Sequence, residues 1–118
     1  MYSVLARWYV LPGQIDPARQ ALEALVADVK ALEPDTLIYQ VREAVAGSLP
    51  PAAEGEIVFF ECYRDKAAFQ AHITGPVFTK FLKDYGALFV QNFPPGKGPF
   101  MLVTTLAGDD GFCREDAV

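Results

Sequence analysis

Hydrophobic residues recur along the chain with two different spacings. Aromatic and β-branched side chains alternate or run together in four segments, residues 2–11, 36–45, 56–63 and 100–106. Short segments of this kind, bounded by Pro, Gly or charged residues, are typical of β-strands. In the second of them, Leu37, Tyr39 and Val41 are expected to share one face, with Ile38 on the other.

An amphipathic helix is predicted between the first two strands. Its apolar positions repeat every three or four residues, at Ala18, Ala21, Leu22, Leu25, Val29 and Leu32. Asp16 offers a side-chain acceptor for the free amides of a helix start, and Pro17 has a preset φ, so we expect the helix to begin there. Pro34 cannot continue a helix and marks its end.

A pair of helices is predicted between the third and fourth strands. Asp65 can cap a short helix over residues 66–74, which ends at a Gly-Pro step. Pro76 suits the first position of a second helix, whose apolar residues repeat at helical spacing as far as Phe89.

The order of elements is therefore strand, helix, strand, strand, helix pair, strand. This is the split βαβ pattern of a ferredoxin-like α+β fold, in which helices cover one side of a four-stranded antiparallel sheet. We expect one domain over residues 1–107, followed by a small, charged and flexible C-terminal tail over residues 108–118.

The predicted strands are apolar on both faces. In the first strand, Val4, Ala6 and Trp8 point one way, while Leu5 and Tyr9 point the other way. A sheet with helices on one side only should instead alternate apolar and polar residues. Because the chain has no further helices to cover the second face, we expect an obligate homodimer in which two sheets face each other.

The composition excludes several classes of protein. The chain has 118 residues, and its formal net charge is −5 at pH 7. Without a basic cluster, it is not expected to bind nucleic acid or an anionic membrane. Two cysteines, Cys62 and Cys113, and one histidine are too few for a disulfide framework or for a metal cage of several His and Cys residues.

Targeting and membrane signals are also missing from the sequence. The first residues show no basic run before a long apolar stretch, and no stretch of about 20 apolar residues occurs. We therefore expect a soluble protein of a reducing cytoplasm.

Three segments resemble the antibiotic biosynthesis monooxygenase family. Residues 4–13 look like its first strand and turn, and residues 33–39 look like its helix-to-strand junction, although Asp35 stands where the family usually has Gly. The most specific segment is 61–78, with a Glu, one residue, an aromatic residue, a short acidic turn and a helix that carries a single His. The resemblance extends over residues 2–106 and implies a dimeric α/β barrel.

The resemblance also implies an activity. Members of the family include oxygenases that oxidise electron-rich phenolic, anthrone or quinol substrates with dioxygen and need no metal or flavin. Removing a proton from such a substrate leaves an anion that can pass an electron to dioxygen directly. The protein must supply a dry pocket, a base and donors for the resulting oxyanion. The chain is therefore expected to be a monooxygenase without a cofactor.

His72 is the candidate base. An imidazole gives and takes protons near neutrality without help from its surroundings, and the family motif carries its His at this position. The alternative is a half-buried His that braces the sheet through a hydrogen bond to a backbone carbonyl.

Glu61 and Tyr63 lie two residues apart, on one face of the strand that precedes this helix. In a catalytic site, Glu61 would orient the ring of His72, and Tyr63 would donate to a substrate oxygen. In the alternative, Glu61 is exposed or paired with Arg7, and Tyr63 is a core side chain.

The remaining candidates would bind the substrate. A flat aromatic molecule stacks on aromatic walls. An arginine suits an anionic intermediate, although strand arginines also form surface ion pairs. The candidate substrate-binding residues are Arg7, Trp8, Tyr39, Phe59, Phe78 and Phe81.

Three functions stay open on the sequence alone. Besides the oxygenase, the chain could be a non-catalytic dimeric module that binds a small aromatic or lipid-like molecule, or an isomerase-like relative that uses the same His without oxygen. Haem degradation is disfavoured, because Ala6, Tyr63 and Leu82 stand where haem-degrading relatives carry Asn, Trp and a ligating His.

Overall fold

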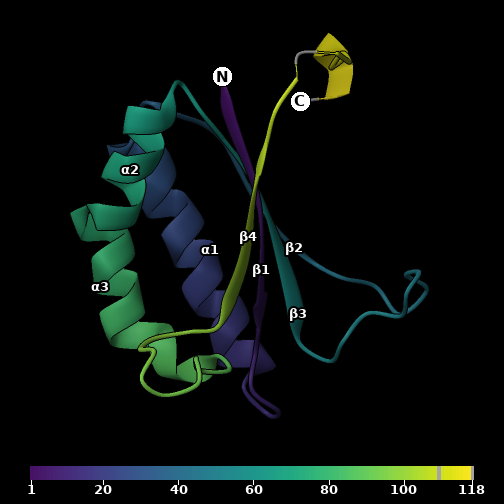
Figure 1. Cartoon of the computed structure of the whole chain (residues 1–118), viewed down its shortest axis with the longest axis vertical. Coiled ribbons are helices and arrows are strands. Elements are labelled where there is room, and N and C mark those ends of the chain that lie inside the picture. Colours follow the sequence, from purple (N-terminus) through teal and green to yellow (C-terminus); the bar gives the residue numbers. More distant parts are fainter. Residues whose placement is uncertain (109, 118) are drawn as a thin grey trace.

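The computed structural model describes residues 1–108 and 110–117. Strands and helices follow each other in the predicted order (Figure 1). Their bounds are β1 Tyr2–Tyr9, α1 Ile15–Leu32, β2 Thr36–Glu43, β3 Glu56–Tyr63, α2 Lys66–Thr74, α3 Pro76–Tyr85 and β4 Met101–Leu106. Two short 3₁₀ turns follow α3 and β4, at Gly86–Leu88 and Glu115–Ala117.

The strands form one antiparallel sheet in the order β2-β3-β1-β4. In its centre, Ala6 of β1 lies opposite Phe59 of β3 and Val103 of β4. Figure 1 shows α1, α2 and α3 together on one side of this sheet. The predicted ferredoxin-like α+β fold is therefore confirmed.

The core lies between the sheet and these helices. The inward residues Val4, Ala6 and Trp8 of β1 are almost completely buried, and the largest of them is Trp8, 3% exposed. Its ring centre lies 4.9 Å from that of Phe59 on β3 and 5.9 Å from that of Phe78 on α3. Aromatic rings thus fill the space between the sheet and the helices.

The start of α1 differs from the prediction. The helix begins at Ile15, after Gln14, and has no side-chain cap. The prediction that Asp16 caps this helix was wrong, because Asp16 lies in the first turn and its carboxylate contacts Arg19 at 3.2 Å. Pro17 is tolerated there because the first amides of a helix have no partner within it.

The two helices between β3 and β4 begin as predicted. Asp65 caps α2, and its carboxylate accepts a hydrogen bond from the Ala68 amide at 2.8 Å. Pro76 occupies the first turn of α3. However, α3 ends at Tyr85 rather than at Phe89, because a glycine, which is a poor helix former, comes next and the chain tightens into the 3₁₀ turn.

Strand β2 has a bulge near its start. Its pairing with β3 shifts between Thr36 and Ile38, so Leu37 is an extra residue and is 41% exposed. The prediction that Leu37 shares a face with Tyr39 and Val41 was wrong for Leu37, while the other two are partly buried. β1 and β2 each end two residues earlier than predicted, and β4 begins one residue later.

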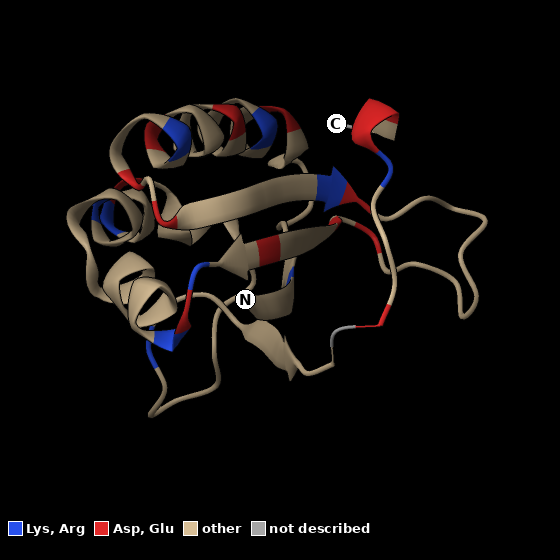
Figure 2. Ribbon diagram, turned by 90° about the horizontal axis from the view of Figure 1, so that it is seen from above, with Lys and Arg blue, Asp and Glu red and all other residues tan. Residues whose placement is uncertain are grey.

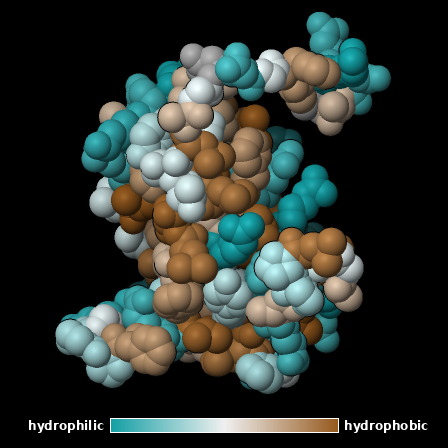
Figure 3. All heavy atoms as spheres, turned by 45° about the vertical axis from the view of Figure 1, so that its right-hand side comes forward, coloured by the Kyte–Doolittle hydropathy of each residue, from teal (hydrophilic) through white to brown (hydrophobic). Residues whose placement is uncertain are grey.

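In the described part of the chain, no helix covers the opposite face of the sheet (Figure 1). Leu5 and Phe60 lie on this outer face and are partly buried, and Leu102 and Leu106 are 47% and 45% exposed. Figure 3 turns this side partly forward and shows hydrophobic side chains across the middle of the molecule. Charged residues lie mainly on the helices and near the strand ends (Figure 2). The expected apolar outer face is confirmed, whereas the second copy that would cover it stays a prediction.

Within residues 1–108 and 110–117, none of the helices combines the length and the apolar character needed to cross a lipid bilayer.

Candidate active site

His72 lies on the side of α2 that faces the sheet. The helix begins directly after β3, at the Asp65 cap, and His72 follows about two turns later. His72 is 3% exposed. Its ring centre lies 5.2 Å from that of Tyr39, 5.5 Å from that of Tyr63 and 5.1 Å from that of Phe78. The predicted base is therefore buried among aromatic side chains.

A carboxylate to which the sequence analysis gave no role contacts this ring. Nδ1 of His72 lies 2.7 Å from Oε1 of Glu33, the residue that follows the last turn of α1. The hydroxyl of Thr36 donates to the same carboxylate oxygen at 3.1 Å. In the sequence, Glu33 stands directly before the helix-ending Pro34 and opens the segment 33–39 that resembles the family, but neither feature indicates its partner. Its partner lies 39 positions further along the chain, so no local pattern could reveal the pair.

Glu61 and Tyr63 share the helix-facing side of β3, as predicted. Glu61 is 6% exposed and Tyr63 is fully buried. The hydroxyl of Tyr63 donates to Oε1 of Glu61. The carboxylate that was expected to orient His72 thus bonds to Tyr63, and Glu33 takes its place at the imidazole.

Burial raises the pKa of three groups near the imidazole, Glu61, Tyr63 and Tyr39. It raises the pKa of the Glu61 carboxyl above its ordinary value, while the hydrogen bond from Tyr63 and the charge of His72 act in the opposite direction. Burial also raises the pKa of the Tyr63 hydroxyl, and the negative charge of Glu61 adds to this effect. The pKa of Tyr39 is raised for the same two reasons, burial first. Both hydroxyls therefore keep their protons at neutral pH and can donate hydrogen bonds.

A cavity of about 330 Å³ lies between the sheet and helices α2 and α3. Glu61 and His72 are part of its wall, and the other lining residues are Val4, Ala6, Trp8, Tyr39, Phe59, Phe69, Ile73, Phe78, Met101 and Val103. The volume falls in the lower part of the range of about 300–1,000 Å³ that is usual for small-molecule sites. Ile73 of α2 and Val103 of β4 are 40% and 51% exposed, so the cavity opens between these two elements.

The sequence of residues 1–84 matches the model of a protein family described as antibiotic biosynthesis monooxygenase. The chain belongs to this family. The matched part includes Glu33, Glu61, Tyr63 and His72 and ends before β4. The resemblance recognised in the sequence is thereby confirmed.

Solved structures share the fold of this family member. The crystal structure of an antibiotic biosynthesis monooxygenase is 23% identical, with a TM-score of 0.72 over 93% of this chain and 100% of that one. The protein Rv0793 of Mycobacterium tuberculosis is 25% identical, with a TM-score of 0.70 over 93% of this chain and 96% of its own. A Caulobacter crescentus protein for which the same enzyme class is proposed is 21% identical, with a TM-score of 0.75 over 92% and 90% of the two chains. None of the curated proteins matches the chain.

Most of the predicted aromatic residues do surround the cavity. Phe81 is the exception: it packs behind the wall, with its ring centre 6.1 Å from that of Trp8. The predicted residues that line the cavity directly are Trp8, Tyr39, Phe59 and Phe78.

Arg7 lies away from this site. Because side chains alternate along a strand, it points to the outer face of the sheet, between the inward-facing Ala6 and Trp8. There its Nε atom lies 3.6 Å from a carboxylate oxygen of Glu56. Among the residues that line the cavity, none is Lys or Arg, so an anion formed there would have to rely on other donors.

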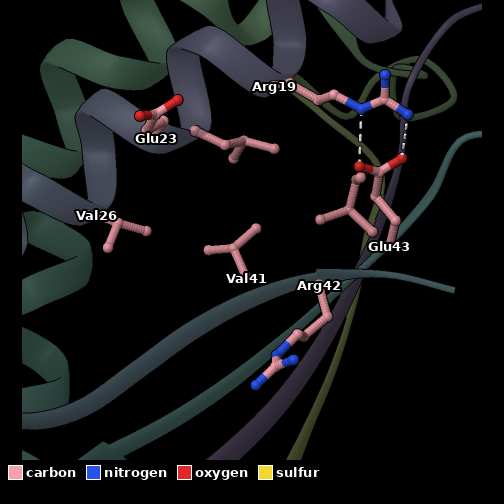
Figure 4. A pocket seen from close by; sticks show the side chains of 8 residues that line it. Arg19, Glu23, Val26, Val41, Arg42 and Glu43 are labelled. Carbon is pink, nitrogen blue, oxygen red and sulfur yellow. Dashed lines mark hydrogen bonds and ion pairs between the residues drawn. The ribbon is translucent and has the colours of Figure 1, made fainter.

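A further hollow, between α1 and β2, lacks this chemistry (Figure 4). Arg19 and Glu43 pair across it through two contacts of 2.8 Å, and none of the predicted site residues is among the eight that line it. Within the described ranges, no group of three or more His, Cys, Asp and Glu side chains is placed to hold a metal ion.

Proposed function

We propose that this chain is a cofactor-independent monooxygenase that oxidises a small anthrone, quinol or phenol with dioxygen. One observation carries the proposal: the single histidine of the chain is buried in the wall of an aromatic-lined cavity and contacts a carboxylate. An imidazole in this setting is suited to remove a proton from a bound aromatic molecule.

The cavity wall supports binding of a flat, mostly apolar substrate. Trp8, Phe59 and Phe78 offer faces and edges on which an aromatic ring can stack. The apolar lining also keeps water away, which strengthens the electrostatic interactions of an anion formed inside. Stacking would bring the acidic group of the substrate to His72.

The proposed reaction starts with proton transfer from the acidic C–H or O–H of the substrate to His72. The resulting anion passes one electron to dioxygen, and the substrate radical and superoxide combine to a peroxide, which takes the proton back from His72. With an anthrone, the peroxide loses water and leaves a quinone. The methylene carbon then gives up four electrons to one dioxygen, of which one oxygen atom stays on that carbon and the other leaves as water.

Tyr39 is the best placed donor for the oxyanion. Tyr63 already donates its one hydroxyl proton to Glu61, whereas Tyr39 lines the cavity and its ring lies beside that of His72. Its raised pKa keeps the hydroxyl protonated during the reaction. Tyr63 then acts by holding Glu61 rather than by touching the substrate.

We also propose that the enzyme is a homodimer of the dimeric α/β barrel type. The apolar outer face of the sheet, with Leu102 and Leu106 about half exposed, supports this proposal. A second copy would bury that face against its own.

Oxygen consumption tests the proposed activity. Protein dialysed against a chelator is mixed with anthrone or with substituted hydroquinones in an oxygen electrode. We expect the wild type to consume oxygen, and H72Q to lower kcat by about 100-fold or more, because the base is lost. Q70A, an exposed change on the same helix, is the matched control and should keep the wild-type rate.

Oxygen uptake by H72Q at the wild-type rate would contradict the proposed role of the histidine. Conversion of a substrate in the absence of oxygen would favour the isomerase-like function instead. Tight binding without any turnover would favour the non-catalytic binding module.

A further inference from the structure

The Glu33–His72 contact sits in the wall between two hollows. On one side is the cavity that faces the sheet, which His72 lines. On the other side is an outer hollow of about 390 Å³, which both residues of the pair line, at the junction of α1, β2, α2 and α3. The side chain of Glu33 is 18% exposed and that of His72 only 2%. The carboxylate therefore reaches water, while the imidazole is buried in the wall of the apolar inner cavity.

The partner at Nδ1 decides which ring nitrogen carries the proton of a neutral imidazole. A carboxylate can only accept hydrogen bonds. With Glu33 Oε1 at 2.7 Å, Nδ1 must be the protonated nitrogen and Nε2 the unprotonated one. In the described part of the chain, hydrogen bonds reach the ring at Nδ1 alone. Nε2 is thus left for a ligand.

The carboxylate is itself held in place. The hydroxyl of Thr36 donates to the same Oε1 at 3.1 Å, and Glu33 stands at the end of α1, where its amide bonds to the carbonyl of Val29 at 2.9 Å. The end of one helix and the start of a strand thereby fix the position of the acceptor. Such support is what a positioning residue requires.

We propose that Glu33 is a positioning residue for His72. It holds the ring in the Nδ1–H form, presents Nε2 to the cavity as the base, and stabilises the imidazolium that forms when Nε2 takes the substrate proton. This inference rests on the proposed function for its catalytic part, but the state of the ring can be measured without any substrate.

Nitrogen NMR of ¹⁵N-labelled protein gives a direct test, because the chain has only one histidine and its ring signals need no assignment. At slightly alkaline pH, we expect the wild type to show a protonated Nδ1 and an unprotonated Nε2. In E33A, the ring should shift toward a mixture of both tautomers. D35N is the matched control: Asp35 lines the same outer hollow but pairs with Arg64 at 2.8 Å, so its loss should leave the imidazole unchanged.

The kinetic test uses the anthrone or hydroquinone oxidation described above. E33A should lower kcat by about tenfold or more, with KM within about twofold, because the base is misoriented while the cavity wall is kept. E33Q keeps the size of the side chain and an acceptor oxygen, so it should retain more activity than E33A. It also serves as the second variant if E33A fails to fold.

A wild-type ring with its proton on Nε2 would overturn the inference, as would Glu33 variants with unchanged tautomer and kcat. If the wild type oxidises no substrate but shows the Nδ1–H tautomer, which depends on Glu33, the proposed oxygenase fails while the positioning of His72 by Glu33 stands.

Discussion

Two carboxylates, the partly exposed Glu33 and the buried Glu61, have different partners near the imidazole. Glu33 contacts Nδ1 of His72 at 2.7 Å, whereas Glu61 bonds to Tyr63. Because burial raises the pKa of the Glu61 carboxyl, folding favours its protonated form. The contribution of Glu61 to stability is therefore greatest below its ordinary pKa of 4.5 and decreases as the pH rises through the higher pKa of the folded state.

The substitution Y63F should make the loss of stability with rising pH larger. It removes the hydrogen bond that favours the ionised carboxylate, so the pKa of Glu61 in the folded state rises further. We expect the free energy of unfolding to fall by about 1–3 kcal/mol, with a larger loss at pH 8 than at pH 4. Denaturant unfolding at the two pH values measures the loss. Y2F is the control, since Tyr2 also stacks on Phe69 but lies outside the Glu61 pair. An equal loss at both pH values would contradict the account.

Single residues were predictable where local geometry fixes them. Glu61 and Tyr63 follow from the alternation of one strand, His72 follows from the chemistry of the single imidazole and from the family motif, and the structure brings the three together. The same alternation already excludes Arg7 from the face that carries Trp8, so its place on the outer side was readable in the sequence. The contact of Glu33 with His72 could not be predicted, because a contact across 39 positions depends on how the helices pack.

At the scale of elements, short local signals position the base. The Asp65 cap starts α2 immediately after β3, and the Gly-Pro step ends it two residues after His72. The imidazole therefore lies between two defined helix ends, and its orientation toward the sheet follows from its position about two turns after the Asp65 cap. Only then can Phe78, near the start of α3, pack on the same ring.

The elements that differ from the sequence predictions are those in which long-range pairing competes with local preference. Asp16 is a good cap, but α1 already begins at Ile15, so Asp16 lies within the first turn and its carboxylate contacts Arg19 instead. The bulge at Leu37 exists only in relation to β3. Periodicity along a single segment contains no information on such a shift.

At the scale of the whole molecule, the two faces of the sheet have different surroundings. Its inner face, with the helices, encloses the cavity. Its outer face remains apolar and partly exposed in a single chain (Figure 3), and the strand register places Leu102 and Leu106 on it. Exposed apolar surface of this kind supports the proposed homodimer. The absence of polar alternation was visible in the sequence, but the geometry of a second copy was not.

A charge on the outer face should separate the proposed dimer. We expect the wild type to sediment at twice the mass of 12.9 kDa at micromolar concentration. L102E should sediment as a folded single chain, because a carboxylate would be buried between the two sheets. The control T105E places the same charge on the same strand, where residue 105 is exposed and on the helix-facing side. A wild type that is folded and monomeric under these conditions would contradict the homodimer.

The account depends most on the claim that His72 removes a proton from a substrate bound in the cavity. Mixing the protein with anthrone under argon tests this step alone, because the anion absorbs at longer wavelength than the neutral compound and cannot go on to react without oxygen. We predict that the wild type produces the anion spectrum and that H72Q does not. When oxygen is admitted, the anion should be oxidised to the quinone and its spectrum should disappear. An anion spectrum of equal intensity with H72Q would show that another group removes the proton and would contradict the account.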